Sequence, residues 1–117
     1  MNFGEVVATV RGCDGVVATA IADRDGIPVE SWGRNPREIE DIIAEYSTFL
    51  RDIASANREL QLGELEQLAV AGNKRLVLVT TITEEYFLMT VVERNGNTGK
   101  ARFASRLAAA RLRQEFV

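Results

Sequence analysis

The chain has 117 residues, 46% of them hydrophobic, and this length and composition predict a single domain, residues 1–117, that buries a core without disulfides or metals. Its 14 basic and 17 acidic side chains leave a formal net charge of only −3, which excludes a general attraction to nucleic acid or to an anionic membrane. The absence of histidine removes the commonest general base and the commonest metal ligand.

No apolar stretch approaches the roughly 20 residues that span a bilayer, so we expect no membrane insertion. The first residues lack the basic start and the apolar block of a secretory signal. The single cysteine, Cys13, cannot form an internal disulfide. We therefore expect a cytoplasmic protein.

The first third of the chain predicts a helix followed by a β-hairpin. Apolar residues at helical spacing predict a short helix over residues 2–11. Residues 16–22 are apolar on both alternating faces, which is typical of a strand covered on both sides. The sequence Asp-Arg-Asp-Gly at 23–26 predicts a tight turn, and residues 27–32 return as a second strand. Pro28 lacks the amide hydrogen that a central strand would use, so we expect this strand at the edge of the sheet.

The strongest periodic segment begins at Asn35. Asn35 as N-cap, Pro36 in the first helical position and Glu38 two residues later form the pattern of a capping box. Apolar residues then recur at spacings of three and four, which predicts one amphipathic helix over residues 36–60. The members of this stripe are Ile39, Ile42, Ile43, Tyr46, Phe49, Leu50, Ile53 and Leu60.

Three apolar runs follow, over residues 65–71, 75–83 and 86–93. The segments between them are too short for parallel crossovers, so we expect an antiparallel meander. A last helix runs close to Phe116, and its predicted apolar side consists of Ala101, Ala104, Leu107, Ala108 and Leu112. The element order is α-β-β-α-β-β-β-α, an α/β protein of the α+β kind.

This order and several local sequences resemble the roadblock/dynein light chain family. The resemblance lies in residues 17–29, which read as strand, Asp-Arg-Asp-Gly turn and strand, in the long helix, and in residues 97–102, which open the last helix. It implies a five-stranded antiparallel sheet in the order 2-1-5-4-3 with helices on both faces, the roadblock and profilin-like fold. It also implies a homodimer or heterodimer in which the long helices pack together and the third strands pair edge to edge.

Members of this family act through protein–protein interaction. They regulate or scaffold small Ras-like GTPases, as MglB-like bacterial GTPase-activating proteins do, or they link cargo to the dynein motor. The resemblance is closest to the MglB-like branch, so we expect a homodimer that activates or localises a small Ras-like GTPase. The alternative is a structural adaptor of the dynein light chain type, without effect on GTP hydrolysis.

One flank of the long helix carries the candidate dimer contact. Its small residues let a second helix approach closely, and in an antiparallel pair Glu40 would meet Arg58 across the two-fold axis. The strand that begins at Leu65 is the more credible dimer edge, because Pro28 protects the other edge of the sheet. The candidate interface residues are Glu40, Ala44, Ser47, Arg51, Ser55, Arg58, Leu65 and Gln67. The other flank is expected to face solvent and holds Asp41, Glu45, Asp52, Ala56 and Glu59.

Arginines supply the remaining candidate contacts with a partner. A stripe on the last helix is ordinarily a solvated face, and its functional interpretation is contact with an acidic partner surface. This secondary set comprises Arg102, Arg106 and Arg113. An arginine finger for a partner's phosphoryl transfer would come from a loop, but no spacing rule selects among the four candidates there. These are Arg24, Arg34, Arg75 and Arg94.

No motif predicts chemistry by the chain itself. Residues 96–101 resemble a phosphate loop, but Arg94 stands where that loop needs a glycine and Ala101 where it needs a hydroxyl. We therefore expect no enzyme activity, cofactor, metal, nucleic acid or small-molecule substrate. Asp23 and Asp25 suit turn hydrogen bonding better than acid–base catalysis.

The single cysteine and the single tryptophan are expected to have structural roles. Cys13 has no activating partner and is expected to be a small, partly buried residue. Trp32 is expected to cover the end of the core, and its alternative role is a partner anchor. A small-molecule sensor of the PAS or GAF kind stays an alternative that a large internal pocket would favour.

Overall fold

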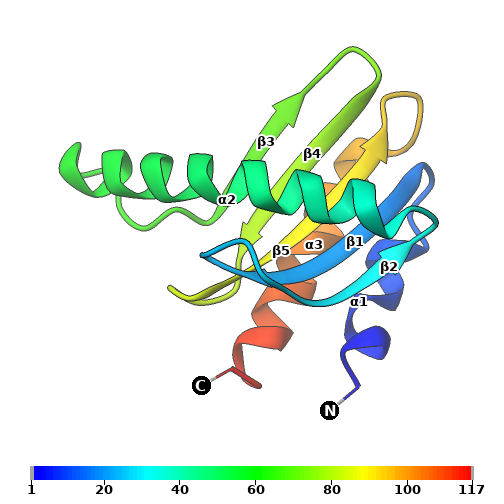
Figure 1. Ribbon diagram of the computed structural model, residues 1–117, viewed down its shortest axis with the longest axis horizontal. Helices are drawn as coiled ribbons and strands as arrows, with labels where there is room; N and C mark the ends of the chain where they lie inside the picture. The colour runs from blue at the N-terminus through cyan, green and yellow to red at the C-terminus, as the bar shows by residue number, and fades with distance from the viewer. Residues whose placement is uncertain (1, 117) are drawn as a thin grey trace.

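The computed structural model describes residues 2–116. Its five strands form one antiparallel sheet in the order β2-β1-β5-β4-β3, with α2 on one face and α1 and α3 on the other (Figure 1). The predicted element order, strand order and placement of helices are therefore confirmed. The elements are α1 (Phe3–Arg11), β1 (Val16–Asp23), β2 (Pro28–Gly33), α2 (Pro36–Glu59), β3 (Gln67–Ala71), β4 (Arg75–Thr81), β5 (Tyr86–Glu93) and α3 (Thr98–Arg113).

The predicted boundaries hold within two residues except at the end of the last helix, and the larger differences have local causes. β4 ends at Thr81 because the amides of Ile82 and Thr83 both donate to the carbonyl of Tyr86 and turn the chain. α3 ends at Arg113, short of Phe116. The Phe116 ring instead lies 4.4 Å from the Tyr86 ring, between centroids, and closes the end of the core.

The turns and caps follow the side chains that predicted them. Asp23 Oδ1 accepts hydrogen bonds from the amides of Asp25 at 2.9 Å and of Ile27 at 3.0 Å, so this carboxylate has the predicted turn role. The Asn35 side chain accepts from the Glu38 amide at 3.2 Å and caps α2. The Glu38 carboxylate turns to Arg75 instead of back to the cap, so only half of the capping box forms.

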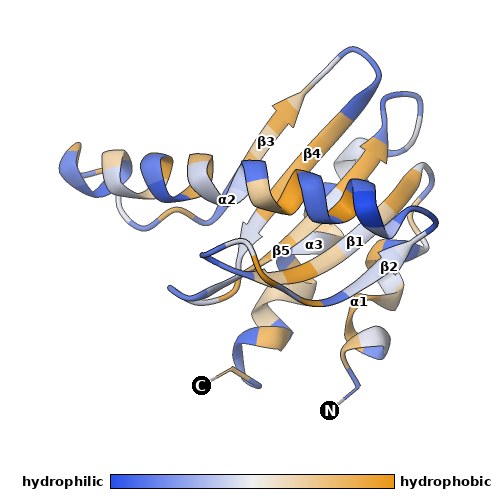
Figure 2. Ribbon diagram, in the orientation of Figure 1, coloured by the Kyte–Doolittle hydropathy of each residue, from blue (hydrophilic) through white to orange (hydrophobic). Residues whose placement is uncertain are grey.

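The sheet separates two cores, because successive side chains on a strand point to opposite faces. Figure 2 shows hydrophobic residues along the central strands β4 and β5. On β5, Phe87 and Met89 face α2, whereas Leu88 faces α1 and α3. All three are fully buried, and burial of such a side chain stabilises a fold by about 1.5–3 kcal/mol. On β1, the side that faces α2 is made of small residues, which bring the helix close, namely Ala18, Ala20 and Ala22.

The face covered by α1 and α3 contains one wrong prediction. Leu107 was expected in the core but is 53% exposed, and its neighbour Phe103 is 58% exposed. The buried stripe of α3 is centred near Ala101 and Ala108, and at about 100° per residue Leu107 lies roughly 120° from Ala101 and about 100° from Ala108 around the helix. Phe103 and Leu107 therefore face away from the sheet.

Cys13 is more deeply buried than expected, and the expected place of Trp32 at the margin of the core is confirmed. Cys13 is 4% exposed, and its Sγ donates to the Thr9 carbonyl at 3.3 Å. Trp32 packs at the margin of the core under α1, with the Arg11 guanidinium 5.7 Å from the ring centroid.

Candidate protein-interaction surface

The apolar side of α2 is wider than the part that the sheet covers. The stripe that lies on the sheet is buried and consists of Ile39, Ile43, Leu50 and Ala54. A second stripe runs beside it, where Ile42 and Tyr46 are half-buried, Phe49 is 55% exposed and Leu60 is 69% exposed. Only the first stripe is fully buried in the core, although Ile42 and Tyr46 of the second stripe also pack against it.

The second stripe has the spacing of a coiled-coil seam. Its residues follow one another in alternating steps of four and three, which is the a/d pattern of a heptad repeat. The Tyr46 ring packs edge-on against Phe49, with 5.9 Å between centroids, so these two seam residues contact each other within the chain. We call this set the α2 seam, and its residues are Ile42, Tyr46, Phe49, Ile53, Ala56 and Leu60.

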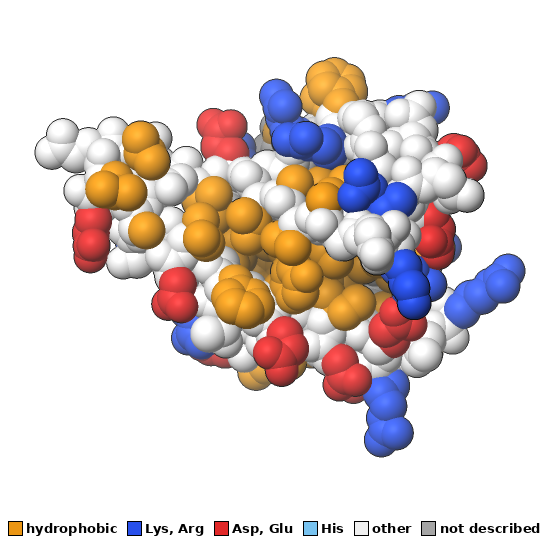
Figure 3. Space-filling view, turned by 90° about the horizontal axis from the view of Figure 1, so that it is seen from above, with side chains coloured by type: hydrophobic (Ala, Val, Ile, Leu, Met, Phe, Trp, Pro, Cys, Tyr) orange, Lys and Arg blue, Asp and Glu red, His pale blue; other side chains and the backbone are white. Residues whose placement is uncertain are grey.

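α2 crosses the sheet, and the C-terminal half of the α2 seam reaches the open edge at β3 (Figure 1). β3 is the outermost strand, and Leu68 and Val70 lie on its α2 side. The last turns of α2 project past β3 (Figure 1). Seen from above, the apolar side chains form one continuous band with acidic side chains along one border (Figure 3). An apolar area of this kind on a single chain is typical of a protein–protein contact.

The open edge also presents backbone hydrogen-bonding groups. The amide of Thr81 donates to the carbonyl of Glu66, and the amide of Gly72 donates to the carbonyl of Arg75. In an antiparallel ladder the residues that bond to the neighbouring strand alternate with residues whose amide and carbonyl point away from it. The outward groups of β3 are therefore those of Gln67, Ala69 and Ala71. They are available to another strand.

The small-residue flank of α2, predicted to contact a second helix, instead packs against the β1–β2 turn of the same chain. Ser47 is 2% exposed and lies against Gly26 of the β1–β2 turn, so its prediction as a surface contact for a second helix is wrong. Arg51 approaches Asp25 of the same turn, with 3.7 Å between Nη1 and Oδ1. The β1–β2 turn occupies the middle of this flank, which therefore packs within the domain.

The other residues of the predicted interface are dispersed. Glu40, Ala44 and Ser55 are exposed, but they lie on the side of α2 away from the seam. Arg58 pairs with Glu64 at 3.4 Å within the chain, so it is already engaged without Glu40 of a second copy.

The two predicted strand residues are held by the domain itself. Leu65 packs partly against the core under α2. The Gln67 amide nitrogen donates to Thr80 Oγ1 at 3.0 Å and to the Arg102 carbonyl at 3.1 Å. Only the backbone of Gln67 remains open to a partner.

The family model of the Roadblock/LC7 domain matches residues 2–93. The chain belongs to the Roadblock/LC7 domain family. The Roadblock/LC7 domain crystal structure from Streptomyces avermitilis is similar at a TM-score of 0.83 and 16% identity, covering 93% of this chain and 92% of that one. The gliding protein MglB from Thermus thermophilus is similar at a TM-score of 0.83 and 16% identity, and the match covers 96% of this chain and 86% of that one. MglC from Myxococcus xanthus is similar at a TM-score of 0.68 and 25% identity, and the match covers 98% of this chain and 99% of that one. No curated protein sequence matches.

Of the loop arginines of this Roadblock/LC7 domain, three are engaged. Arg24 is half-buried and donates to the Thr83 carbonyl at 3.3 Å, and burial, followed by the nearby charge of Arg58, lowers the pKa of its guanidinium. Arg94 donates to the Gly72 carbonyl at 2.9 Å. Arg75 pairs with two carboxylates, those of Glu38 at 2.6 Å and Glu93 at 3.2 Å.

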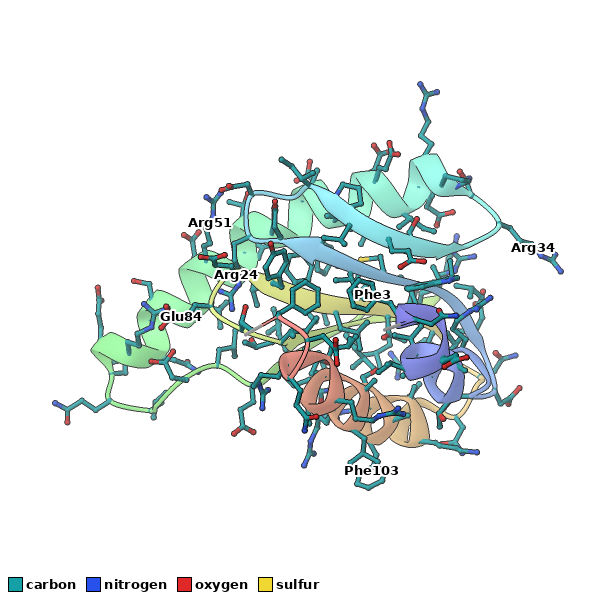
Figure 4. The ribbon with its side chains drawn as sticks, turned by 90° about the horizontal axis from the view of Figure 1, so that it is seen from below. Phe3, Arg24, Arg34, Arg51, Glu84 and Phe103 are labelled. Carbon is teal, nitrogen blue, oxygen red and sulfur yellow. The ribbon has the colours of Figure 1, made fainter. Side chains whose placement is uncertain are left out.

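Arg34 differs from the other three arginines. Its side chain projects away from the loop between β2 and α2, and it has no hydrogen bond or ion pair within residues 2–116 (Figure 4). It is therefore the loop arginine that is free to meet a partner.

The arginine stripe of α3 divides in the same way. Arg113 donates to the carbonyls of Ile82 at 2.7 Å and Thr81 at 3.3 Å and fastens the end of α3 to the β4–β5 turn. Arg102 and Arg106 are exposed, beside Phe103, which points outward from the helix (Figure 4). The side chains of α3 carry five basic groups and no acidic group.

The structure offers little to a small ligand among the described residues. A hollow of about 520 Å³ lies beside the first turns of α2. The charged groups Glu38, Arg75 and Glu93 in its lining are paired with one another, whereas Arg34, which also lines it, has no ion pair in the described part of the chain. No group of three or more potential metal ligands occurs within residues 2–116. Across the same part of the chain, each helix is too short or too polar to cross a bilayer.

Proposed function

We propose that this Roadblock/LC7 domain is one half of a dimer that regulates or scaffolds a small Ras-like GTPase. The observation that carries the proposal is the exposed α2 seam, which reaches the unpaired edge of β3. Membership of the Roadblock/LC7 family and the fold likeness to MglB support a small GTPase as the partner class. The proposal places the chain in the cytoplasm.

The pairing follows from where the seam and the edge lie. If two such edges pair about a two-fold axis normal to the sheet, the sheet doubles and both α2 helices stay on the same face. The same axis sets the helices antiparallel with their seams in contact. Both exposed features are then covered by one assembly, which is why we favour this geometry.

The dimer would act by position and not by chemistry of its own. A surface composed of two domains can hold the GTPase in its GTP form and orient the groups that promote hydrolysis. Arg34 is our candidate for a direct contribution, since a free guanidinium stabilises the charge that develops on a transferred phosphoryl group. Arg102 and Arg106 are our candidates for a separate contact with an acidic partner surface.

The test is a single-turnover GTP hydrolysis assay with the small GTPase of the same organism. We expect preferential binding to the GTP form and faster hydrolysis. Arg34→Ala should remove most of the acceleration, because an arginine finger contributes on the order of 10³-fold or more. Arg37→Ala, at the start of α2, is the matched control and should change nothing. Unchanged hydrolysis together with no binding to the GTP form would refute the proposal.

The adaptor hypothesis predicts a different result from the same material. An adaptor of the dynein light chain type would pair and capture a peptide, and the rate of GTP hydrolysis would stay the same. A disordered peptide as the main copurifying partner, in place of a GTPase, would favour it.

A further inference from the structure

The border of the α2 seam that faces away from the sheet is acidic at every heptad. In the frame that places Tyr46 at a and Phe49 at d, the adjoining g positions hold Glu38, Glu45, Asp52 and Glu59. Glu38 is paired with Arg75, whereas the other three are exposed and have no ion pair within residues 2–116. The seam is therefore bordered by three carboxylates without a basic partner.

The arginines of α2 lie too far around the helix to pair with the carboxylates along the acidic border of the seam. Arg37, Arg51 and Arg58 all occupy f positions of the same frame, on the side opposite the seam. Arg51 and Arg58 are also engaged with carboxylates of the same chain. The other border of the seam faces the sheet and carries no charge, since it consists of Ile43, Leu50 and Asn57.

A second copy of this chain would place acid against acid. In an antiparallel helix pair the g positions of one helix meet the g positions of the other. Because Glu45, Asp52 and Glu59 are all acidic, every register of two identical helices brings like charges together. Like charges at such a spacing disfavour association. A partner helix with Lys or Arg at these positions would turn the same contacts into attractions.

We propose that the partner of the α2 seam is a different Roadblock/LC7-type chain, with basic residues along the matching border of its long helix. It binds this chain more tightly than a second copy does. The inference rests on the pairing geometry of the proposed function and names the partner class within it. Its test contains no GTPase, so its failure and the failure of GTPase regulation are distinguishable.

The first experiment mixes the wild-type chain with the triple variant Glu45→Lys, Asp52→Lys and Glu59→Lys. At low salt the mixed pair should be on the order of tenfold tighter than either self-pair, and salt near 0.3 M should reduce the difference. The control triple reverses exposed acids away from the seam, with the same change in net charge, at Glu5, Glu40 and Glu115. It should show no preference for the wild-type chain. A wild-type self-pair as tight as the mixed pair would overturn the inference.

The second experiment measures wild-type self-association by sedimentation as NaCl is raised. Screening of like charges should strengthen it severalfold between about 25 mM and 300 mM. A neutral triple, Glu45→Gln with Asp52→Asn and Glu59→Gln, should pair more tightly than wild type and respond less to salt. Self-association that weakens with salt, or is indifferent to it, contradicts the charge argument. Absence of pairing in every mixture contradicts the pairing geometry as well.

Discussion

The hydroxyl of Ser47 lies against Gly26, so closely that a Cβ atom on this glycine would come within 2.9 Å of Ser47 Oγ. Ser47 Oγ donates to the Ala44 carbonyl at 2.9 Å, and Gly26 has φ +86° in the β1–β2 turn. The turn therefore seats on α2 only because one residue lacks a side chain and the other has a short one. This flank of α2 is occupied by the domain's own hairpin.

The first prediction contrasts two serines on α2. Ser47→Arg should destabilise the fold by about 3 kcal/mol or more, because the site is buried and the longer side chain must displace the turn. Ser55→Arg should stay within about 0.5 kcal/mol of wild type, since Ser55 is exposed. Chemical denaturation measures both values. Equal stability of the two variants would show that Ser47 is not buried as described.

The second prediction concerns the α2 seam. Phe49→Glu should weaken pairing at least about tenfold, because an apolar side chain at the centre of an interface is replaced by a charge. Its stability as a single chain should change little, since Phe49 is 55% exposed there. Leu107→Glu on α3 is the control, with similar exposure but no place in the seam. Sedimentation velocity at matched concentrations compares the three proteins, and equal weakening by both variants would contradict the assignment.

The third prediction concerns the outward amides of β3. Ala69→Pro removes an N–H that points away from β4, so the ladder within the chain should survive while strand pairing with a partner is lost. Ala69→Val keeps the amide and suits a strand, so it should pair like wild type. Loss of pairing is measured by sedimentation and retention of fold by circular dichroism. Normal pairing of the proline variant would exclude β3 as the paired edge.

The fourth prediction concerns two buried hydroxyls that join β5 to α3. Thr90 Oγ1 and Ser105 Oγ are 3.1 Å apart, and both residues are fully buried. Ser105→Ala should cost about 1–3 kcal/mol, because it leaves the Thr90 hydroxyl without this partner. Adding Thr90→Val should recover part of the loss. Thermal or chemical denaturation of the four proteins forms a double-mutant cycle, and strictly additive losses would mean that the two hydroxyls do not interact.

The elements of the fold could be predicted because their turns and caps depend on short-range chemistry, whereas the strand order 2-1-5-4-3 was expected from the family resemblance alone. Asp23 and Gly26 set the hairpin, Asn35 and Pro36 set the start of α2, and the proline in β2 indicates an edge strand. Each signal involves residues within a few positions of one another. Such signals do not need the rest of the chain to be interpreted.

The interaction surface could be predicted only in part. The sequence predicts an open sheet edge at β3, and the structure has β3 outermost. The sequence places the helix contact on the small-residue flank, because it takes the whole apolar stripe of α2 as core, whereas we propose the contact on the α2 seam. The apolar residues of α2 form two stripes side by side, one buried on the sheet and one exposed. The exposed stripe can be recognised by its alternating steps of four and three residues from Ile42 to Leu60. The position of the hairpin under Ser47 depends on a contact between residues far apart in sequence, which composition and spacing do not reveal.

The C-terminal end of α2 affects how long an unpaired copy of the protein should survive in a cell. Beyond Ala54 no residue of α2 is buried, and Leu60 and Leu62 are both 69% exposed. A copy without a partner therefore carries a poorly supported helical end, which is the kind of segment that opens first and that proteases attack. We expect surplus copies to be degraded and paired copies to persist. The abundance of the chain would then follow the abundance of its partner.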